Sequence, residues 1–154
     1  MASLLMLVTE DPAALYCMRV DLIEKALTGS VIGAFYEVYN ALGFGFLEHL
    51  YSMALERELR GRGHSVAREL RVNVMYKGEI LGTQRLDMVV ENRLIIEIKS
   101  TYELHPSASR QVYNYLRATN LEVALLLHFG PEPRVHRMVC RNHRGASPPD
   151  PAKS

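Results

Sequence analysis

The segment Leu94-Ile95-Ile96-Glu97-Ile98-Lys99-Ser100 predicts a buried β-strand that carries two charged side chains. Because the side chains of a strand alternate between its two faces, Glu97 and Lys99 share one face. Burying these charges beside isoleucines is costly unless each has a partner or a metal ion. In a solvated loop the same charges would face water and would need no partner. The simplest interpretation is that this strand carries an active site.

The composition limits the class of protein. At 154 residues and 48% hydrophobic residues, the chain can bury one sizeable core and has no room for two. The formal net charge of +1 gives no general argument for a polyanionic partner, so any nucleic-acid binding would have to be local.

Cys17 and Cys140 lie far apart, in no metal-ligand spacing, which fits a reducing compartment. The apolar run Leu4–Val8 is too short for a membrane span and lacks the basic leader of a signal peptide. We therefore expect a soluble, cytoplasmic protein.

The hydrophobic periodicity predicts helix, helix, three strands, helix, strand and strand, in that order. The helices are expected at residues 31–42, 47–60 and 106–119, and the strands at 71–76, 80–90, 94–100, 123–129 and 134–140. Tight turns at Lys77-Gly78-Glu79 and Glu91-Asn92-Arg93 would join the first three strands into a meander. This order describes an α/β fold, an α+β sandwich with a central mixed β-sheet flanked by helices.

The same pattern sets the expected domain limits. Residues 1–20 have no clear period and are expected to be an N-terminal extension. Residues 21–140 would form the single domain. Residues 141–154 contain three prolines and no apolar period, so we expect a disordered tail.

Asp87 lies in the strand that precedes Glu97, and the two would be close if the strand register permits. Two converging carboxylates repel each other unless a cation lies between them, and such oxygen ligands suit Mg²⁺ or Mn²⁺. Lys99 could then hold the attacking water or neutralise charge on a phosphate. The alternative is a structural salt bridge on a wet sheet face, and Glu97 with Lys99 alone does not decide between the two.

Two further groups favour an active site. Gln111 and Tyr115 are four residues apart on the helix after the Glu97 strand, so they share a face and can hydrogen-bond a phosphate or a base edge. Glu48 falls in the first turn of another helix, with Tyr51 three residues on. Each has an ordinary alternative, since Tyr115 could pack, Gln111 could face solvent and Glu48 could complement the helix dipole.

At these positions the sequence resembles the GxxExxY proteins, a bacterial group of the PD-(D/E)XK nuclease superfamily. Gly45, Glu48 and Tyr51 match the signature, and the resemblance runs over about residues 32–139. The further matching segments are Leu42-Gly43, Phe46-Leu47, Tyr76-Lys77-Gly78, Asp87, Glu97-x-Lys99 and Gln111 through Leu116. One stretch departs from the usual pattern, since His105-Pro106-Ser107-Ala108-Ser109 replaces a Thr-Pro-x-His-x lead into the glutamine helix. No role is assigned to His105.

The resemblance implies a restriction-endonuclease-like core and divalent-metal hydrolysis of phosphodiester bonds. Asp87, Glu97 and Lys99 would be the catalytic triad. Glu48 would be the helical acid that joins the metal site, and the carbonyl of Ile98 would add a further metal ligand. The expected cofactor is Mg²⁺ or Mn²⁺.

The resemblance also implies a nucleic-acid substrate, with DNA expected. Gln111-x-x-x-Tyr115 resembles the helix motif of RecB-like exonucleases, so Gln111 and Tyr115, together with Tyr51, are expected to bind substrate. A small domain with little basic surface could require a homodimer to hold a long duplex.

Two other hypotheses stay open. The sequence has no nucleophile elbow, glycine-rich phosphate loop, Cys-His arrangement or paired zinc spacing, which excludes the common hydrolase and nucleotide-triphosphatase classes. A nucleic-acid or nucleotide binding module could keep the metal site without cutting. Alternatively, the polar cluster could be structural in a small interaction protein.

Overall fold

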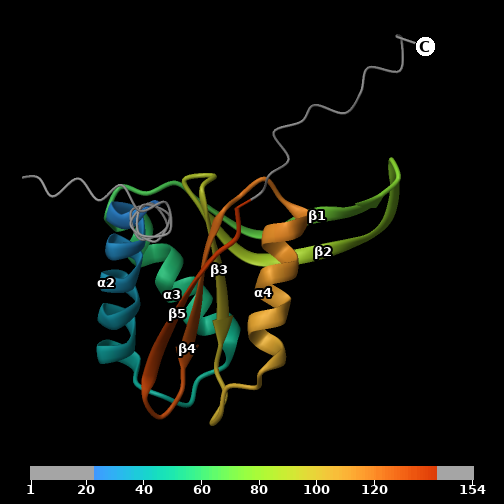
Figure 1. Ribbon diagram of the computed structural model, residues 1–154. Helices are drawn as coiled ribbons and strands as arrows, with labels where there is room; N and C mark the ends of the chain where they lie inside the picture. The colour runs from blue at the N-terminus through green and yellow to red at the C-terminus, as the bar shows by residue number, and fades with distance from the viewer. Residues whose placement is uncertain (1–22, 142–154) are drawn as a thin grey trace, which may run out of the picture.

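The computed structural model describes residues 23–141, shown in Figure 1. The expected N-terminal extension at 1–20 lies outside the described residues, as does the expected tail apart from Arg141. The described elements are α2 (Lys25–Leu42), α3 (Glu48–Gly61), β1 (Val66–Tyr76), β2 (Glu79–Val90), β3 (Leu94–Lys99), α4 (Ser107–Ala118), β4 (Val123–Phe129) and β5 (Pro133–Val139).

These elements match the sequence predictions in type and order, but two of them begin several residues earlier than expected. α2 begins at Lys25 because Leu27 extends the buried stripe of the helix by one turn. β1 begins at Val66, which pairs with Val90 of β2. Its first residues, Val66-Ala67-Arg68-Glu69, do not alternate in polarity, so only the pairing with β2 reveals that they form a strand.

Within residues 23–141 the strands form a five-stranded sheet in the order β1-β2-β3-β4-β5. All neighbours are antiparallel except β3 and β4, which are parallel. A parallel pair requires a crossover connection, and α4 supplies it. At the tip of the β1–β2 hairpin, Lys77 and Gly78 have φ angles of 48° and 82°, as a two-residue hairpin turn requires. The sheet is therefore mixed, as expected.

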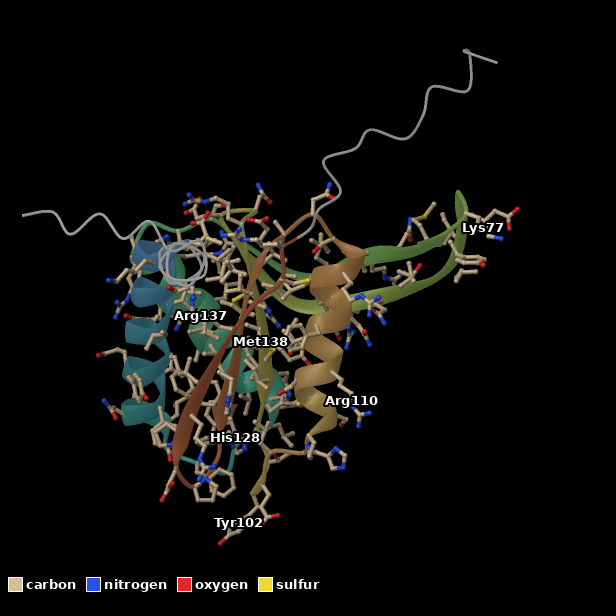
Figure 2. The ribbon with its side chains drawn as sticks, viewed as in Figure 1. Lys77, Tyr102, Arg110, His128, Arg137 and Met138 are labelled. Atoms are coloured by element: carbon tan, nitrogen blue, oxygen red, sulfur yellow. The ribbon has the colours of Figure 1, made fainter. Side chains whose placement is uncertain are left out.

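Helices cover both faces of the sheet (Figure 1). On one face, α2 and α3 pack on the sheet around Phe35, Leu55 and Phe129. On the other face, α4 packs on it through Val112, Leu116 and their sheet neighbours, which include Met138 of β5 (Figure 2). β3 and β4 are buried from both sides, which explains why their sequences are nearly continuous hydrophobic runs.

No helix among residues 23–141 is both long enough and apolar enough to span a membrane.

Phe129 joins the sheet to both helices of the first face. It is fully buried, and its ring centroid lies 4.1 Å from that of Tyr51 and 4.7 Å from that of Phe35. We expect Phe129→Ala to lower the free energy of unfolding by about 3–5 kcal/mol, measured by urea denaturation. Leu81→Ala is the control, since Leu81 is 66% exposed and should change stability by less than about 0.5 kcal/mol. Similar losses in both variants would contradict this view of the core.

Candidate active site

The site begins where β2 and β3 stop pairing. Their register ends at Met88 opposite Ile96, whereas β3 continues to pair with β4 as far as Lys99. Beyond the last pair, the backbone N–H of Ile98 donates a hydrogen bond to Asp87 Oδ2 at 2.9 Å. The carboxylate thus takes the place of a strand neighbour. This arrangement opens the sheet and holds Asp87 beside β3.

Glu97 and Lys99 form a short ion pair within this opening. Lys99 Nζ lies 2.7 Å from Glu97 Oε1 and donates a hydrogen bond to it. Glu97 is only 1% exposed, and its second oxygen, Oε2, is buried without a hydrogen-bond partner among the described residues. Leaving a buried acceptor unsatisfied costs free energy. Glu97 Oε2 is therefore the atom that a proton or a cation would satisfy.

Burial and charge shift the pKa values of this cluster. Burial raises the pKa of Glu97 to about 7, and the nearby Asp87 carboxylate adds to the rise against the hydrogen bond from Lys99. Burial also raises the pKa of Glu48 above its ordinary value. Although burial lowers the pKa of Lys99, its bond to Glu97 and the surrounding carboxylates raise it overall. Burial and the charge of Glu97 raise the pKa of Tyr115.

A cavity of about 360 Å³ collects the predicted site residues from four elements. The expected residues that line it are Glu48 of α3, Asp87 of β2, Glu97, Ile98 and Lys99 of β3, and Gln111 and Tyr115 of α4. Gln111 Nε2 donates a hydrogen bond to the Tyr115 hydroxyl, so these two act as one unit. The shared helix face predicted from their spacing is present.

Five further residues line the cavity beside the predicted site residues. They are His49, Ser52, Arg68, Glu69 and Arg85. Ser52 lies one helical turn after Glu48, so its i+4 spacing could have identified it. Arg68 and Glu69 belong to the part of β1 that only strand pairing reveals.

Tyr51 is absent from the described residues that line this cavity. It is fully buried, and its ring stacks on Phe129. Its hydroxyl donates to the Gly43 carbonyl at 2.5 Å and accepts from the Phe46 N–H at 3.2 Å. The prediction that Tyr51 binds substrate is therefore replaced by a structural role. Tyr51 fixes the loop before α3 and, through it, the first turn that carries Glu48.

His105 also lies apart from the cavity lining. Its Nδ1 accepts a hydrogen bond from the backbone N–H of Ser107 at 3.1 Å, at the start of α4. This contact satisfies one of the free N–H groups at a helix N-terminus. His105 thus supports the helix that carries Gln111.

The residues of this cavity fit a divalent cation. Asp87, Glu97 and Glu48 offer carboxylate oxygens, the donor type that Mg²⁺ and Mn²⁺ prefer. The N–H and C=O of one strand residue point to the same side, so the carbonyl of Ile98 faces Asp87 as its N–H does. The unpaired Oε2 of Glu97 is a free acceptor in this set.

The carboxylates are nevertheless not gathered as metal ligands. Within residues 23–141, no three His, Cys, Asp or Glu side chains lie close enough together to hold an ion. Asp87 is held by Ile98 and Glu97 by Lys99. Side-chain rotation would therefore accompany metal binding.

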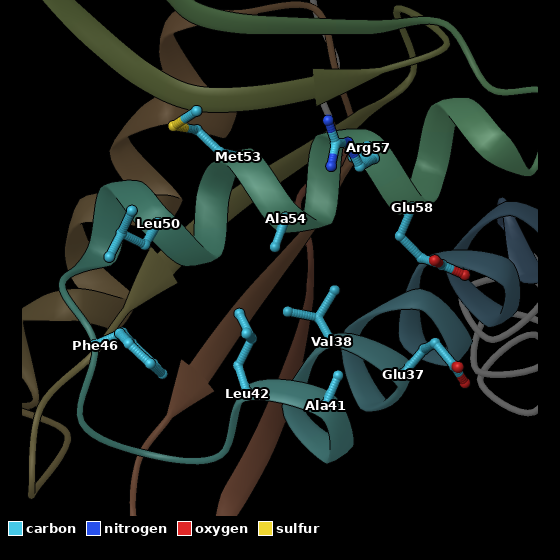
Figure 3. Close-up of a pocket in the computed structure, with 10 residues that line it drawn as sticks. All are labelled: Glu37, Val38, Ala41, Leu42, Phe46, Leu50, Met53, Ala54, Arg57 and Glu58. Carbon is cyan, nitrogen blue, oxygen red and sulfur yellow. The ribbon is translucent and has the colours of Figure 1, made fainter.

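A larger cavity, of about 630 Å³, lies between α2 and α3 (Figure 3). Its floor is apolar, with Leu42, Leu50 and Met53 among its residues, and Glu37, Arg57 and Glu58 are its charged groups. It contains no residue of the Asp87–Glu97–Lys99 cluster. The smaller polar cavity is therefore the candidate active site.

Glu97 should make the stability of the metal-free protein depend on pH. The folded protein keeps the Glu97 proton to about pH 7, whereas the unfolded chain loses it near the ordinary pKa of 4.5. Between these values the folded state binds more protons, so the free energy of unfolding falls as pH rises. In Glu97→Gln we expect the decrease in the free energy of unfolding over this pH range to be smaller by up to about 3 kcal/mol, measured by urea denaturation in EDTA. Glu132→Gln, at an exposed glutamate on the β4–β5 turn, should leave the profile unchanged. Parallel profiles for wild type and Glu97→Gln would contradict the prediction.

Comparison with known proteins identifies the family. The family model described as the PD-(D/E)XK nuclease superfamily matches residues 25–141. No curated protein matches the chain. One similar solved structure is "Crystal structure of SSO0001", with 19% identity and a TM-score of 0.50 over 82% of this chain. This chain spans 64% of the length of that chain, and the likeness shows a shared fold alone. Because the family model covers most of the sequence and the fold agrees with it, the chain belongs to the PD-(D/E)XK nuclease superfamily.

Proposed function

We propose that this protein is a nuclease that uses Mg²⁺ or Mn²⁺ to hydrolyse phosphodiester bonds in DNA. Membership of the superfamily supports a nuclease-type function. The observation that carries the proposal is the polar cavity, where buried Glu97 keeps one unsatisfied oxygen beside Asp87 and Lys99. A bound metal ion would polarise the phosphate and lower the pKa of a bound water.

The proposed metal ligands are Asp87, Glu97, Glu48 and the carbonyl of Ile98. Because burial raises the pKa of Glu97 to about 7, Glu97 must lose a proton before it can bind a cation at acidic pH. Burial also raises the pKa of Glu48 above its ordinary value, so its proton competes with a cation more than that of an exposed glutamate would. The site should therefore bind metal more tightly as pH rises.

Lys99 has an electrostatic role in this proposal. Its pKa is raised above the ordinary value, so its ammonium group stays charged at neutral pH and is no proton acceptor. From its position beside Glu97 it stabilises negative charge that develops on the phosphate, or orients the attacking water.

Neutral and cationic donors position the substrate. The raised pKa of Tyr115 keeps its hydroxyl protonated, so Tyr115 and Gln111 donate hydrogen bonds to phosphate or base oxygens. Arg85, at the edge of the cavity, is 64% exposed and lies 3.7 Å from Glu69, a weak pair that leaves it able to meet a phosphate.

The Gly45, Glu48 and Tyr51 signature supports placing the chain among the GxxExxY proteins, and the Gln111–Tyr115 pair supports an exonuclease-like site. A cytoplasmic location and a homodimer stay predictions from the sequence.

A nucleic-acid binding module that does not cut is the second candidate. It is favoured by the internal bonds of Asp87 to Ile98 and of Glu97 to Lys99, which satisfy part of the ligand set without a metal. In that case metal ions would bind without hydrolysis of DNA.

Cleavage of end-labelled single- and double-stranded DNA with Mg²⁺ or Mn²⁺ tests the proposed activity. We expect Glu97→Gln and Lys99→Met each to lower the cleavage rate by roughly 10²–10³-fold, because each removes charge at the reacting phosphate. Arg134→Met, at an exposed arginine, is the matched control and should cleave at the wild-type rate. Circular dichroism would verify folding. Cleavage that survives both site substitutions would overturn the assignment.

Binding of Mn²⁺, followed by electron paramagnetic resonance, tests the ligand set. We expect Asp87→Asn and Glu97→Gln to weaken binding by about tenfold or more, since each removes a charged ligand. Asparagine keeps an oxygen to accept the Ile98 N–H, so the fold is preserved. Gln111→Ala should leave the affinity unchanged. Tight metal binding without cleavage of any DNA would favour the binding module.

A further inference from the structure

The outer face of α4 carries a stripe of residues suited to nucleic acid. Arg110, Tyr113, Asn114 and Arg117 follow at i, i+3, i+4 and i+7, which places them on one side of the helix. All four are exposed, and the sequence of α4 contains no acidic residue. Figure 2 shows Arg110 directed away from the sheet. We call these four residues the α4 stripe.

The hairpin of β1 and β2 forms an arm that extends beyond the rest of the sheet (Figures 1 and 2). We call residues 71–85 the β1–β2 arm. It carries three cationic side chains, Arg71, Lys77 and Arg85, against one anionic side chain, Glu79. Lys77 lies at its tip, with Nζ 5.3 Å from the centroid of the Tyr76 ring.

The tip of the arm is apolar and exposed. Met75, Tyr76, Ile80 and Leu81 are between 51% and 66% exposed. An isolated two-stranded hairpin is only marginally stable in water, and contiguous exposed apolar side chains mark binding surfaces. The tip therefore has the composition of a surface that is covered when the protein is bound to a partner.

The arm and the stripe adjoin each other and the candidate active site. A cavity of about 320 Å³ lies between them, lined by Val74, Met75 and Gln84 of the arm and by Asn114, Arg117 and Ala118 of α4. At the base of the arm, Arg85 lines the catalytic cavity together with Gln111 of α4. One surface thus runs from the catalytic cavity along α4 to the arm.

We propose that the α4 stripe and the β1–β2 arm hold double-stranded DNA, with the arm in a groove and the stripe on the phosphates. A two-stranded ribbon can lie in the minor groove, and from there aliphatic side chains at its tip can insert between base steps. The acid-free stripe, with its two arginines, favours a polyanion over a basic or apolar protein partner. This inference rests on the proposed function, because the DNA strand then enters the catalytic cavity.

Fluorescence anisotropy with a labelled duplex and a single strand, in EDTA, tests the surface. We expect Arg110→Ala/Arg117→Ala to weaken duplex binding at least tenfold and to reduce the slope of log affinity against log salt by about 2. Ile80→Ser/Leu81→Ser should weaken duplex binding at least threefold, spare the single strand, and abolish the fluorescence rise of a 2-aminopurine base in the duplex. Duplex affinity that is normal in both double variants would overturn the proposal.

Matched controls lie on α3, across the sheet from α4. Arg57→Ala controls for charge. Met53→Ser controls for the loss of an exposed apolar side chain in Ile80→Ser/Leu81→Ser, because Met53 is 53% exposed, close to the 59% of Ile80. Neither control should change DNA affinity. Equal losses for duplex and single strand would overturn the duplex assignment. A change from dimer to monomer in sedimentation, with DNA affinity intact, would place a second copy of the chain on the arm and overturn the proposal.

Hydrolysis of bis(p-nitrophenyl) phosphate separates this inference from the proposed function, because so small a diester occupies only the catalytic cavity. Arm and stripe variants should hydrolyse it at the wild-type rate, in support of a separate docking surface. If the wild type hydrolyses no phosphodiester while duplex binding still depends on the stripe and the arm, the hydrolytic function fails and the docking surface stands. Loss of this hydrolysis in the arm and stripe variants would contradict a separate docking role.

Discussion

β2 leaves β3 at Asp87, and beyond that point a single hydrogen bond, from the Ile98 N–H to Asp87 Oδ2, joins the two strands. The candidate site depends on this divergence. If the two strands had continued to pair, the backbone of β2 would have taken up the Ile98 N–H and no opening would exist beside Glu97. Because β3 stays paired with β4 on its other side, the opening has a rigid wall. A buried central strand can therefore present charged side chains without disturbing the core.

The burial that this geometry imposes also sets the chemistry of the cluster. Glu97 is kept from water and close to Asp87, so its pKa rises to about 7 and its proton competes with any cation at acidic pH. The same carboxylates raise the pKa of Lys99, so its ammonium group keeps its charge. The cluster thus places more carboxylate groups than ammonium groups in one cavity. A divalent cation would neutralise this excess of negative charge, and a phosphate could then bind beside the cation and Lys99.

Tyr51 illustrates how a motif residue can serve a site without entering it. Its hydroxyl closes the loop from Gly43 to Phe46, and the Ser100 hydroxyl donates to the Phe46 carbonyl at 2.6 Å from the end of β3. Gly43 and Gly45 both have positive φ angles in this loop, which favours glycine. Together these contacts tie the first turn of α3 to β3, and Glu48 is brought to the cavity as a result. A motif spacing identifies such a residue but does not reveal whether it faces substrate or core.

The sequence by itself determined the order of the elements, the mixed sheet, and the local pairs Glu97 with Lys99 and Gln111 with Tyr115. These follow from backbone periods of about two and 3.6 residues, which act over a few positions and are written in the local sequence. Only the tertiary structure decided the approach of Asp87 to β3, the burial of Tyr51 and the entry of Arg68 and Glu69 into the cavity. Each of these depends on strand register or on how a helix rotates against the sheet. Contacts between distant segments set both, and no local pattern encodes them.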